Sequence, residues 1–342
     1  MPPLLNKEGP APVPASWSLM TNTPLVSVVI PTYNRAHVLH KAIDSVLNQT
    51  FTDFEIIVVN DGSTDNTTEL LNRYGHRIRR IYQDNSGVSA ARNAGINCST
   101  GKWVAFLDSD DEWKVNYLDK QMDRAARNPG LCMQTTNCLF VALTGETQNY
   151  FEINGSLSFF GSSDYLLLAE PFSFVVEHGP WQVGSTIVLR HALIKAGLFD
   201  RNLTISEDFD LMARVSLRGA FGLIRDELVN IYRRKEAIDC LSNQAKKNPL
   251  HARQSGESIY EKLSEIETLK YSDRRLLKTI SSANRRAIGN LLVKAGNTTG
   301  ARESFRRAFQ IDRSITSLGK YALSFLPRRA NIWLSEKYRG TQ

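Results

Sequence analysis

Polar side chains that could bind a phosphorylated ligand follow three short apolar runs in the first third of the chain. The segments are Pro-Thr-Tyr-Asn-Arg (31–35), Asn-Asp-Gly-Ser-Thr-Asp (60–65) and Asp-Ser-Asp-Asp (108–111). A tyrosine ring can lie against a nucleobase, a carboxylate can accept hydrogen bonds from a base or ribose, and crowded carboxylates can hold a hard cation on phosphates. Together the three segments favour a nucleotide-binding site.

Each segment also has a simpler interpretation when it is taken alone. Asp110 and Asp111 could cap the next helix, Asp61 with Gly62 could form a turn, and Tyr33 could be an ordinary packing residue. The nucleotide interpretation therefore depends on a fold that brings the three segments together.

Apolar runs alternate with helix-like stretches from residue 25 onward, and this alternation predicts the elements that would position the three segments. We expect strands at 25–30, 55–60, 78–83 and 103–108, and helices at 36–47, 63–71 and 87–97. Strand and helix in this rhythm indicate βαβ units and an α/β fold with a mostly parallel sheet. Ligands bind such a sheet at the carboxyl ends of its strands, where all three polar segments lie.

The rest of the chain is expected to divide at residue 240. The predicted parts are a flexible Pro-rich leader (1–24), an α/β domain (25–240) and a basic helical region (241–342). Further elements are expected as strands near 133–141 and 185–190, a short helix near 164–169, and helices at 256–270, 273–294 and 299–326. Residues 291–313 are similar to one helical hairpin of the tetratricopeptide kind, which must pack on its neighbours to be stable.

The net charge of +7 is distributed unevenly, because residues 241–342 contain 20 Lys and Arg against 8 Asp and Glu. Apolar residues recur at helical spacing in this region at Ile311, Ile315, Leu318, Ala322 and Phe325, and later at Ile332, Trp333, Leu334 and Tyr338. A basic amphipathic helix can lie on an anionic membrane surface or can cap the α/β domain, and both interpretations stay open. No recognised nucleic-acid-binding module accompanies the basic residues of this region, so nucleic acid is not an expected partner.

Several function classes lack their sequence signals. The four cysteines have no metal-ligand spacing, GxxxxGK[ST] and a dinucleotide fingerprint are absent, and no apolar run is long enough to span a membrane. Proline interrupts the first residues, so a secretory signal is not expected. The expected location is the cytoplasm, either free or peripheral on the inner face of the membrane.

Four strings resemble the nucleotide-binding half of family 2 inverting glycosyltransferases, which have the GT-A fold. They are VSVVIPTYNR, SVLNQTFTDFEIIVVNDGSTD, GVSAARNAGI and WVAFLDSDDEW. The resemblance is strong over 25–127 and looser to residue 234, through WQVGSTIVLRHALIKAGLFD, SEDFDLMARVSLRG and YRR. It implies a nucleotide-sugar half at 25–127 and an acceptor half at 128–240.

The resemblance also implies roles for individual residues. On the nucleotide-sugar side it places Pro31, Thr32, Tyr33, Arg35, Asp61, Arg92, Asn93, Asp108 and Ser109. Asp110 would hold Mg²⁺ or Mn²⁺ on the diphosphate, and Asp208 would be the catalytic base, with Glu207 as the alternative. The acceptor side would contain Trp181, Gln182 and Gly184. Arg233 and Arg234 are candidates for the diphosphate, although with Lys235 they could also be a solvated charge run.

The expected function is metal-dependent, inverting transfer of a sugar from a nucleotide diphosphate, with UDP as the expected nucleotide, to a saccharide or lipid-linked saccharide. Assembly of cell-surface polysaccharide is the setting that the resemblance suggests. A catalytically silent, nucleotide-sugar-binding scaffold is the alternative, and the presence of both Asp110 and Asp208 argues against it. A nucleotidyltransferase would need more basic residues in the segment 31–35, which contains only Arg35.

Overall fold

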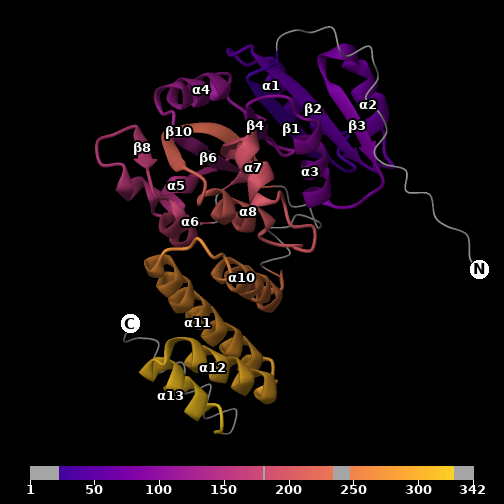
Figure 1. Ribbon diagram of the computed structural model, residues 1–342. Helices are drawn as coiled ribbons and strands as arrows, with labels where there is room; N and C mark the ends of the chain where they lie inside the picture. The colour runs from indigo at the N-terminus through magenta and orange to yellow at the C-terminus, as the bar shows by residue number, and fades with distance from the viewer. Residues whose placement is uncertain (1–22, 180–181, 234–246, 327–342) are drawn as a thin grey trace, which may run out of the picture.

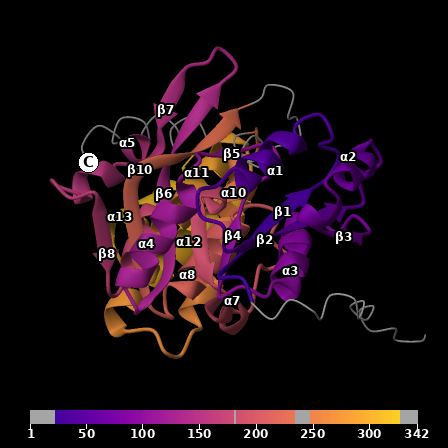
Figure 2. The same ribbon diagram turned by 90° about the horizontal axis from the view of Figure 1, so that it is seen from above.

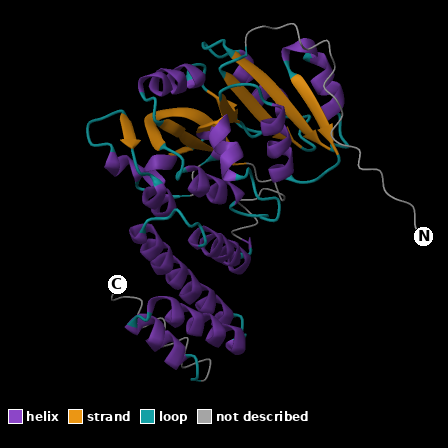
Figure 3. Ribbon diagram, viewed as in Figure 1, coloured by secondary structure: helices purple, strands orange, loops and turns teal. Residues whose placement is uncertain are grey.

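The computed structural model describes residues 23–179, 182–233 and 247–326, and these form a sheet-containing part and a helical part (Figures 1 and 3). The predicted leader lies outside the described residues except for its last two positions, and the predicted boundary at residue 240 lies outside them as well.

The first four strands and three helices form the predicted βαβ arrangement. Their bounds are β1 (Val26–Thr32), α1 (Leu39–Leu47), β2 (Phe54–Asp61), α2 (Thr67–Arg73), β3 (Arg79–Gln83), α3 (Val88–Cys98) and β4 (Trp103–Phe106). These strands are parallel and lie in the order β3-β2-β1-β4. All seven residues of β1 are buried, because helices cover both faces of the sheet.

The second half of the sheet is mixed. Its strands are β5 (Glu112–Trp113), β6 (Leu131–Ala142), β7 (Thr147–Asn149), β8 (Tyr165–Leu168), β9 (Thr186–Leu189) and β10 (Ala220–Arg233). Strand β9 runs antiparallel between β4 and β6, and β10 continues the sheet parallel to β6. The helices here are α4 (Tyr117–Arg127), α5 (Tyr150–Ile153), α6 (Phe172–His178), α7 (Arg190–Ala196) and α8 (Glu207–Val215).

The short helix expected near 164–169 is wrong. Residues Tyr165–Leu168 form strand β8, which pairs antiparallel with β10. A run as short as Tyr-Leu-Leu-Leu has no periodicity that separates strand from helix, so pairing with β10 decides its conformation.

The helical part contains α10 (Pro249–Ser264), α11 (Tyr271–Lys294), α12 (Thr298–Asp312) and α13 (Ile315–Leu323). The expected hairpin is confirmed, because α11 and α12 pack side by side, with Phe305 against Gly289, where a Cβ would lie 2.4 Å from the ring. The helix expected at 299–326 is two helices. Arg313 adopts a left-handed conformation with φ of 52°, and the Ser314 hydroxyl accepts a hydrogen bond from the backbone N–H of Ser317 to begin α13.

Helices α10 and α11 share the main apolar core with the sheet, and they lie behind its β6 and β10 strands when the protein is seen from above (Figure 2). Ile259 and Leu263 of α10 and Leu277 of α11 are fully buried members of this core. The start of the helical part is therefore packed on the sheet-containing part as one hydrophobic unit.

Helix α13 presents its apolar residues to solvent. Ile315 is 90% exposed and Leu318 and Phe325 are also exposed, whereas the buried residues of this segment are Ser317 and Ser324. An exposed apolar face of this kind marks a surface for another molecule more often than an isolated exposed leucine does. Among the described helices, none has the length and hydropathy needed to cross a bilayer.

Candidate active site

The segments 31–35 and 60–65 are bound to each other at the carboxyl ends of β1 and β2. The backbone N–H of Asn34 donates to the Ser63 hydroxyl at 2.9 Å, and the Asn34 side-chain oxygen accepts from the backbone N–H of Thr64 at 2.8 Å. Asn34 has a φ of 52°, a conformation that asparagine tolerates better than most residues. This locked turn presents the half-exposed ring of Tyr33 at the sheet edge.

Two residues that precede this turn lie in β1. Pro31 and Thr32 are buried, and the Thr32 hydroxyl has no hydrogen-bond partner among the described residues. The sheet therefore fixes the backbone on which Tyr33 and Arg35 are presented.

Asp61, at the end of β2, is buried and accepts three hydrogen bonds from the end of β3 and the loop after it. Its Oδ1 accepts from Gln83 Nε2 at 2.7 Å and from the backbone N–H of Ser86 at 2.9 Å, and its Oδ2 accepts from the backbone N–H of Gly87 at 2.9 Å. A carboxylate has about four lone-pair sites, so the described residues leave one site on Oδ2 available to a ligand.

The acidic turn 108–111 follows β4 and contains three carboxylates. Asp111 is buried and accepts a hydrogen bond from the backbone N–H of Tyr232 at 3.0 Å. Burial, with the nearby charges of Asp108 and Asp110, holds the pKa of Asp111 well above its usual range. Neither Asp110 nor Asp111 caps a helix, because α4 begins later, with Asn116 at its N-cap.

The other two acids of the turn are more accessible. The side chains of Asp108 and Asp110 are 37% and 28% exposed, and Ser109 between them is buried. Asp110 Oδ2 lies 4.0 Å from Arg35 Nε, which joins the acidic turn to the Tyr33 turn.

Arg92 of α3 connects the acidic turn to the start of α8. Its Nη2 donates to Asp108 Oδ1 and its Nη1 donates to Glu207 Oε1, both at 2.9 Å. The guanidinium is buried and lies 5.3 Å from the centre of the Phe199 ring. One cation is thus surrounded by the carboxylates of Asp108, Glu207 and, at longer range, Asp208.

Asp208 is partly buried on the first turn of α8. Burial, reinforced by the negative charge of Glu207, raises the pKa of Asp208 to about 7, and Arg92 opposes part of this shift. Its Oδ1 accepts a hydrogen bond from the backbone N–H of Phe209 at 2.7 Å. A carboxyl with this pKa can accept a proton near neutral pH, which is the property that a general base needs.

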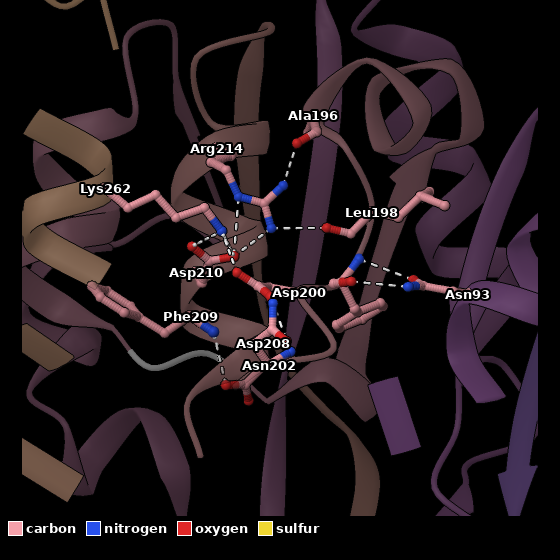
Figure 4. Close-up of polar contacts among 11 residues, drawn as sticks. Asn93, Ala196, Leu198, Asp200, Asn202, Asp208, Phe209, Asp210, Arg214 and Lys262 are labelled. Atoms are coloured by element: carbon pink, nitrogen blue, oxygen red, sulfur yellow. Dashed lines mark hydrogen bonds and ion pairs between the residues drawn. The ribbon is translucent and has the colours of Figure 1, made fainter. Parts of the chain in front are cut away.

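The second acid of Asp208-Phe209-Asp210 has a different environment. Asp210 is fully buried, and its carboxylate pairs with Arg214 of the same helix and with Lys262 of α10 (Figure 4). Lys262 Nζ lies 3.1 Å from Asp210 Oδ1 and 2.8 Å from Asp200 Oδ2. The four-residue spacing of Asp210 and Arg214 could have indicated their ion pair, but nothing local in the sequence indicates Lys262.

Asn93 is bonded to the protein at both ends of its side-chain amide. Its Nδ2 donates to the Phe199 carbonyl, and its Oδ1 accepts from the Phe199 N–H, both at 2.9 Å. These bonds fix the ring of Phe199 beside Arg92, which is a role that sequence reasoning did not anticipate.

Two of the three expected acceptor-side residues, Gly184 and Gln182, are among the described residues. Gly184 is buried beside the acidic turn, and its carbonyl accepts a hydrogen bond from Trp113 Nε1 at 2.8 Å. The Gln182 side chain forms a hydrogen bond with the Tyr150 hydroxyl. Burial raises the pKa of Tyr150 to about 12; the bond to Gln182 opposes this rise and the negative charge of Asp208 adds to it. Arg233 lies 4.0 Å from the Phe140 ring centre and close enough to Asp111 to oppose the rise of its pKa. Trp181 and Arg234 lie outside the described residues.

The carboxylates of the acidic turn have the donor chemistry that a divalent cation needs. In the described ranges, no three His, Cys, Asp or Glu side chains are grouped as a preformed metal centre. Mg²⁺ is commonly held by only one or two carboxylates together with substrate phosphates. Asp108 and Asp110, two accessible carboxylates on one turn, fit this second kind of site.

Comparisons with known proteins show which sequences and folds this chain is similar to. Residues 27–159 match the family described as Glycosyl transferase family 2. A putative teichuronic acid biosynthesis glycosyltransferase, TuaG of Bacillus subtilis, is 44% identical over 109 residues, which are 30% of this chain and 43% of that protein. Against three further curated relatives of 32 to 40% identity, this chain spans 28 to 56% of their length.

Solved structures show that the likeness extends to the helical part. The crystal structure of S. aureus TarS 1-349 in complex with UDP-GlcNAc has a TM-score of 0.68 at 18% identity and covers 93% of this chain and 92% of its own. The mannosyltransferase PcManGT from Pyrobaculum calidifontis, in complex with GDP-Man and Mn²⁺, has a TM-score of 0.54 at 17% identity. The match covers 92% of this chain and 84% of PcManGT. Residues 27–159 thus match glycosyl transferase family 2, and the chain has the GT-A fold.

Proposed function

We propose that this protein transfers a sugar, with inversion, from a nucleotide diphosphate to a saccharide or lipid-linked saccharide acceptor. The observation that carries the proposal is the link made by Arg92. This one buried cation bonds Asp108, on the donor-side turn, and Glu207, the neighbour of Asp208. A carboxylate on the turn proposed to hold the cation of the diphosphate and the carboxylate next to the proposed base therefore lie around one guanidinium.

The sheet edge supports binding of the donor nucleotide. The exposed ring of Tyr33 is available for stacking on a base, and the free lone-pair site of Asp61 Oδ2 is available for a base N–H. UDP is the nucleotide we propose, because the neighbour TarS was crystallised with UDP-GlcNAc.

The donor-side carboxylates support a divalent cation, Mg²⁺ or Mn²⁺, with Asp110 as its protein ligand and Asp108 beside it. When bound, the cation would neutralise negative charge on the departing diphosphate. Arg35, and also Arg233 and Arg234, are the basic side chains we propose for the remaining phosphate charge.

Asp208 is the proposed base, and the structure favours it over Glu207. Glu207 is buried and bonded to Arg92, whereas Asp208 is partly exposed and has a pKa of about 7. The acceptor hydroxyl would give its proton to Asp208 as its oxygen attacks the anomeric carbon and the diphosphate departs. Gln182 and Gly184, with Trp181, are proposed to shape the acceptor side.

The outward apolar face of α13 supports a membrane-bound or lipid-linked setting. We infer that Ile315, Leu318 and Phe325 insert at an anionic membrane surface, with the basic excess of the helical region facing the lipid headgroups. Assembly of cell-surface polysaccharide is the proposed context, and the relative TuaG is described as a putative teichuronic acid biosynthesis glycosyltransferase. A catalytically silent scaffold, which is the alternative, would not need the raised pKa of Asp208.

The first experiment is calorimetric binding of UDP, GDP and their sugar conjugates, each with and without Mn²⁺, followed by product analysis with a panel of acceptors. Metal-dependent binding of one nucleotide with sugar transfer supports the proposal. Binding without transfer to any acceptor supports the scaffold. Absence of binding to every nucleotide contradicts both.

A further inference from the structure

A four-charge cluster joins the helical part to the helix that carries Asp208. Asp200 and Asp210 supply two negative charges, and Arg214 and Lys262 supply two positive charges (Figure 4). Asp210 is fully buried, so its charge requires close partners. Lys262 is the member of the cluster that comes from α10, far away in the chain.

The cluster holds α8 and the loop 196–200 in one position. Arg214 donates to the carbonyls of Ala196 and Leu198, the latter at 2.8 Å, while Lys262 bridges Asp200 in the same loop to Asp210 in α8. The loop contains two consecutive residues with positive φ, Gly197 and Leu198, so it needs such external bonds to keep its conformation.

The same loop reaches the active site through Phe199. Its backbone is bonded to Asn93, and its ring lies against Arg92, which bonds Asp108 and Glu207. Asp210 lies two residues after Asp208, on the first turns of α8. Lys262 is therefore connected to both sides of the proposed catalytic cluster, once through α8 and once through Phe199.

We propose that Lys262 is a positioning residue for the proposed sugar transfer. By holding Asp200 and Asp210 together, it fixes the start of α8 and the Phe199 loop, and so orients Asp208 and Arg92. This inference rests on the proposed function, and it makes the helical part a component of the active site rather than an appended module. A second contact also joins α10 to the start of α8. The Tyr260 ring of α10 packs edge-on against the Phe209 ring, with the ring centres 6.1 Å apart.

A nearby lysine provides a matched control. Lys270 of the helical part also forms an ion pair with the sheet-containing part, through Glu170. Both side chains of this pair are more than half exposed. Exposed pairs of this kind contribute little to stability. If any lost ion pair between the two parts impaired the enzyme, Lys270→Met would have the same effect as Lys262→Met.

The test compares Lys262→Met, Lys262→Arg and Lys270→Met in the full chain. We expect Lys262→Met to lower kcat by about 10- to 100-fold with KM for the nucleotide sugar within about twofold, because small displacements of a reacting group have effects of this size. Lys262→Arg should restore most of kcat, and Lys270→Met should match the wild type. Wild-type kcat in Lys262→Met would overturn the proposal, as would an equal loss in Lys270→Met.

Hydrogen exchange gives a readout that does not require activity. In Lys262→Met, amides of 205–215 and 196–200 should exchange faster while those of β1 stay protected, because the loss is local. If Lys262→Met does not fold, Asp200→Asn, which leaves Asp210 paired with Arg214, should show the same pattern more weakly. If Lys262→Met exchanges faster but the wild type itself transfers no sugar, the coupling would stand and the proposed function would be rejected. Unchanged exchange in both variants would reject the coupling.

Discussion

The two Asp-x-Asp segments have the same spacing and opposite environments. Asp108 and Asp110 follow a strand, and both carboxylates are partly exposed, next to Arg92 and Arg35. Asp208 and Asp210 lie on a helix, where a separation of two residues turns side chains about 200° apart. One of them faces the cluster around Arg92, and the other is buried against Arg214 and Lys262. The secondary structure that carries the motif therefore decides whether its acids act together or separately.

The largest effect should come from Asp208→Asn, which keeps the shape of the side chain and removes its basicity. We expect the transfer rate to fall by about 10²- to 10⁴-fold, the usual contribution of general base catalysis. Nucleotide affinity should stay near the wild-type value, because the proposed contacts with the nucleotide base are made by Tyr33 and Asp61. Initial rates of transfer and calorimetric affinity measure the two quantities, and a wild-type rate would show that Asp208 is not the base.

Asp210→Asn should cause the next largest effect, on stability. Removing one partner of a buried ion pair leaves the other charge uncompensated, and the expected loss is about 3 kcal/mol in the free energy of unfolding. Chemical denaturation measures it. The matched change on the first motif, Asp108→Asn, affects an accessible carboxylate and should cost clearly less, so equal losses would remove the contrast between the motifs.

The transfer rate should depend on pH through Asp208. With a pKa of about 7, kcat/KM should rise about tenfold per pH unit below this value and level off above it, as the carboxylate form becomes populated. Stability should move in the opposite direction. The folded protein binds more protons than the unfolded chain between the ordinary value of 3.8 and about 7, so stability falls as pH rises through this window. Asp208→Asn should remove this contribution, and an unchanged pH dependence of unfolding would contradict it.

The smallest of these effects should come from Tyr33→Ala, at the sheet edge. Loss of base stacking should weaken nucleotide binding by about 1 to 3 kcal/mol and leave the melting temperature nearly unchanged, since the ring is half exposed. Calorimetry with UDP and thermal unfolding separate the two outcomes. Full retention of affinity would place the base elsewhere.

The sequence predicted the first half of the fold well because its elements are local and periodic. Strands such as Val26–Thr32 are continuous apolar runs, and the ligand side of a parallel sheet follows from their direction. Tyr165–Leu168 was mispredicted because only its pairing with β10 makes it a strand. The helix break at Arg313 depends on one left-handed residue, which ordinary helical periodicity does not reveal.

The candidate site divides in the same way. Asp108, Asp110 and Asp208 are candidates that their motifs indicate, whereas Asn93 and Lys262 have hydrogen-bond partners 106 and 52 residues away in the chain. The family likeness supplied positions for the chemistry but not the charge cluster beneath α8. The pairing of Asp210 with Arg214 and Lys262 appears only in the tertiary structure.

The most direct test of the separate roles proposed for the two Asp-x-Asp segments is calorimetric titration of UDP, with and without Mn²⁺, into the wild type, Asp208→Asn and Asp110→Ala. The account predicts tight, metal-dependent binding in the wild type and in Asp208→Asn, and loss of the metal-dependent part in Asp110→Ala. Metal-dependent binding that survives Asp110→Ala but disappears in Asp208→Asn would contradict the assignment of the two motifs.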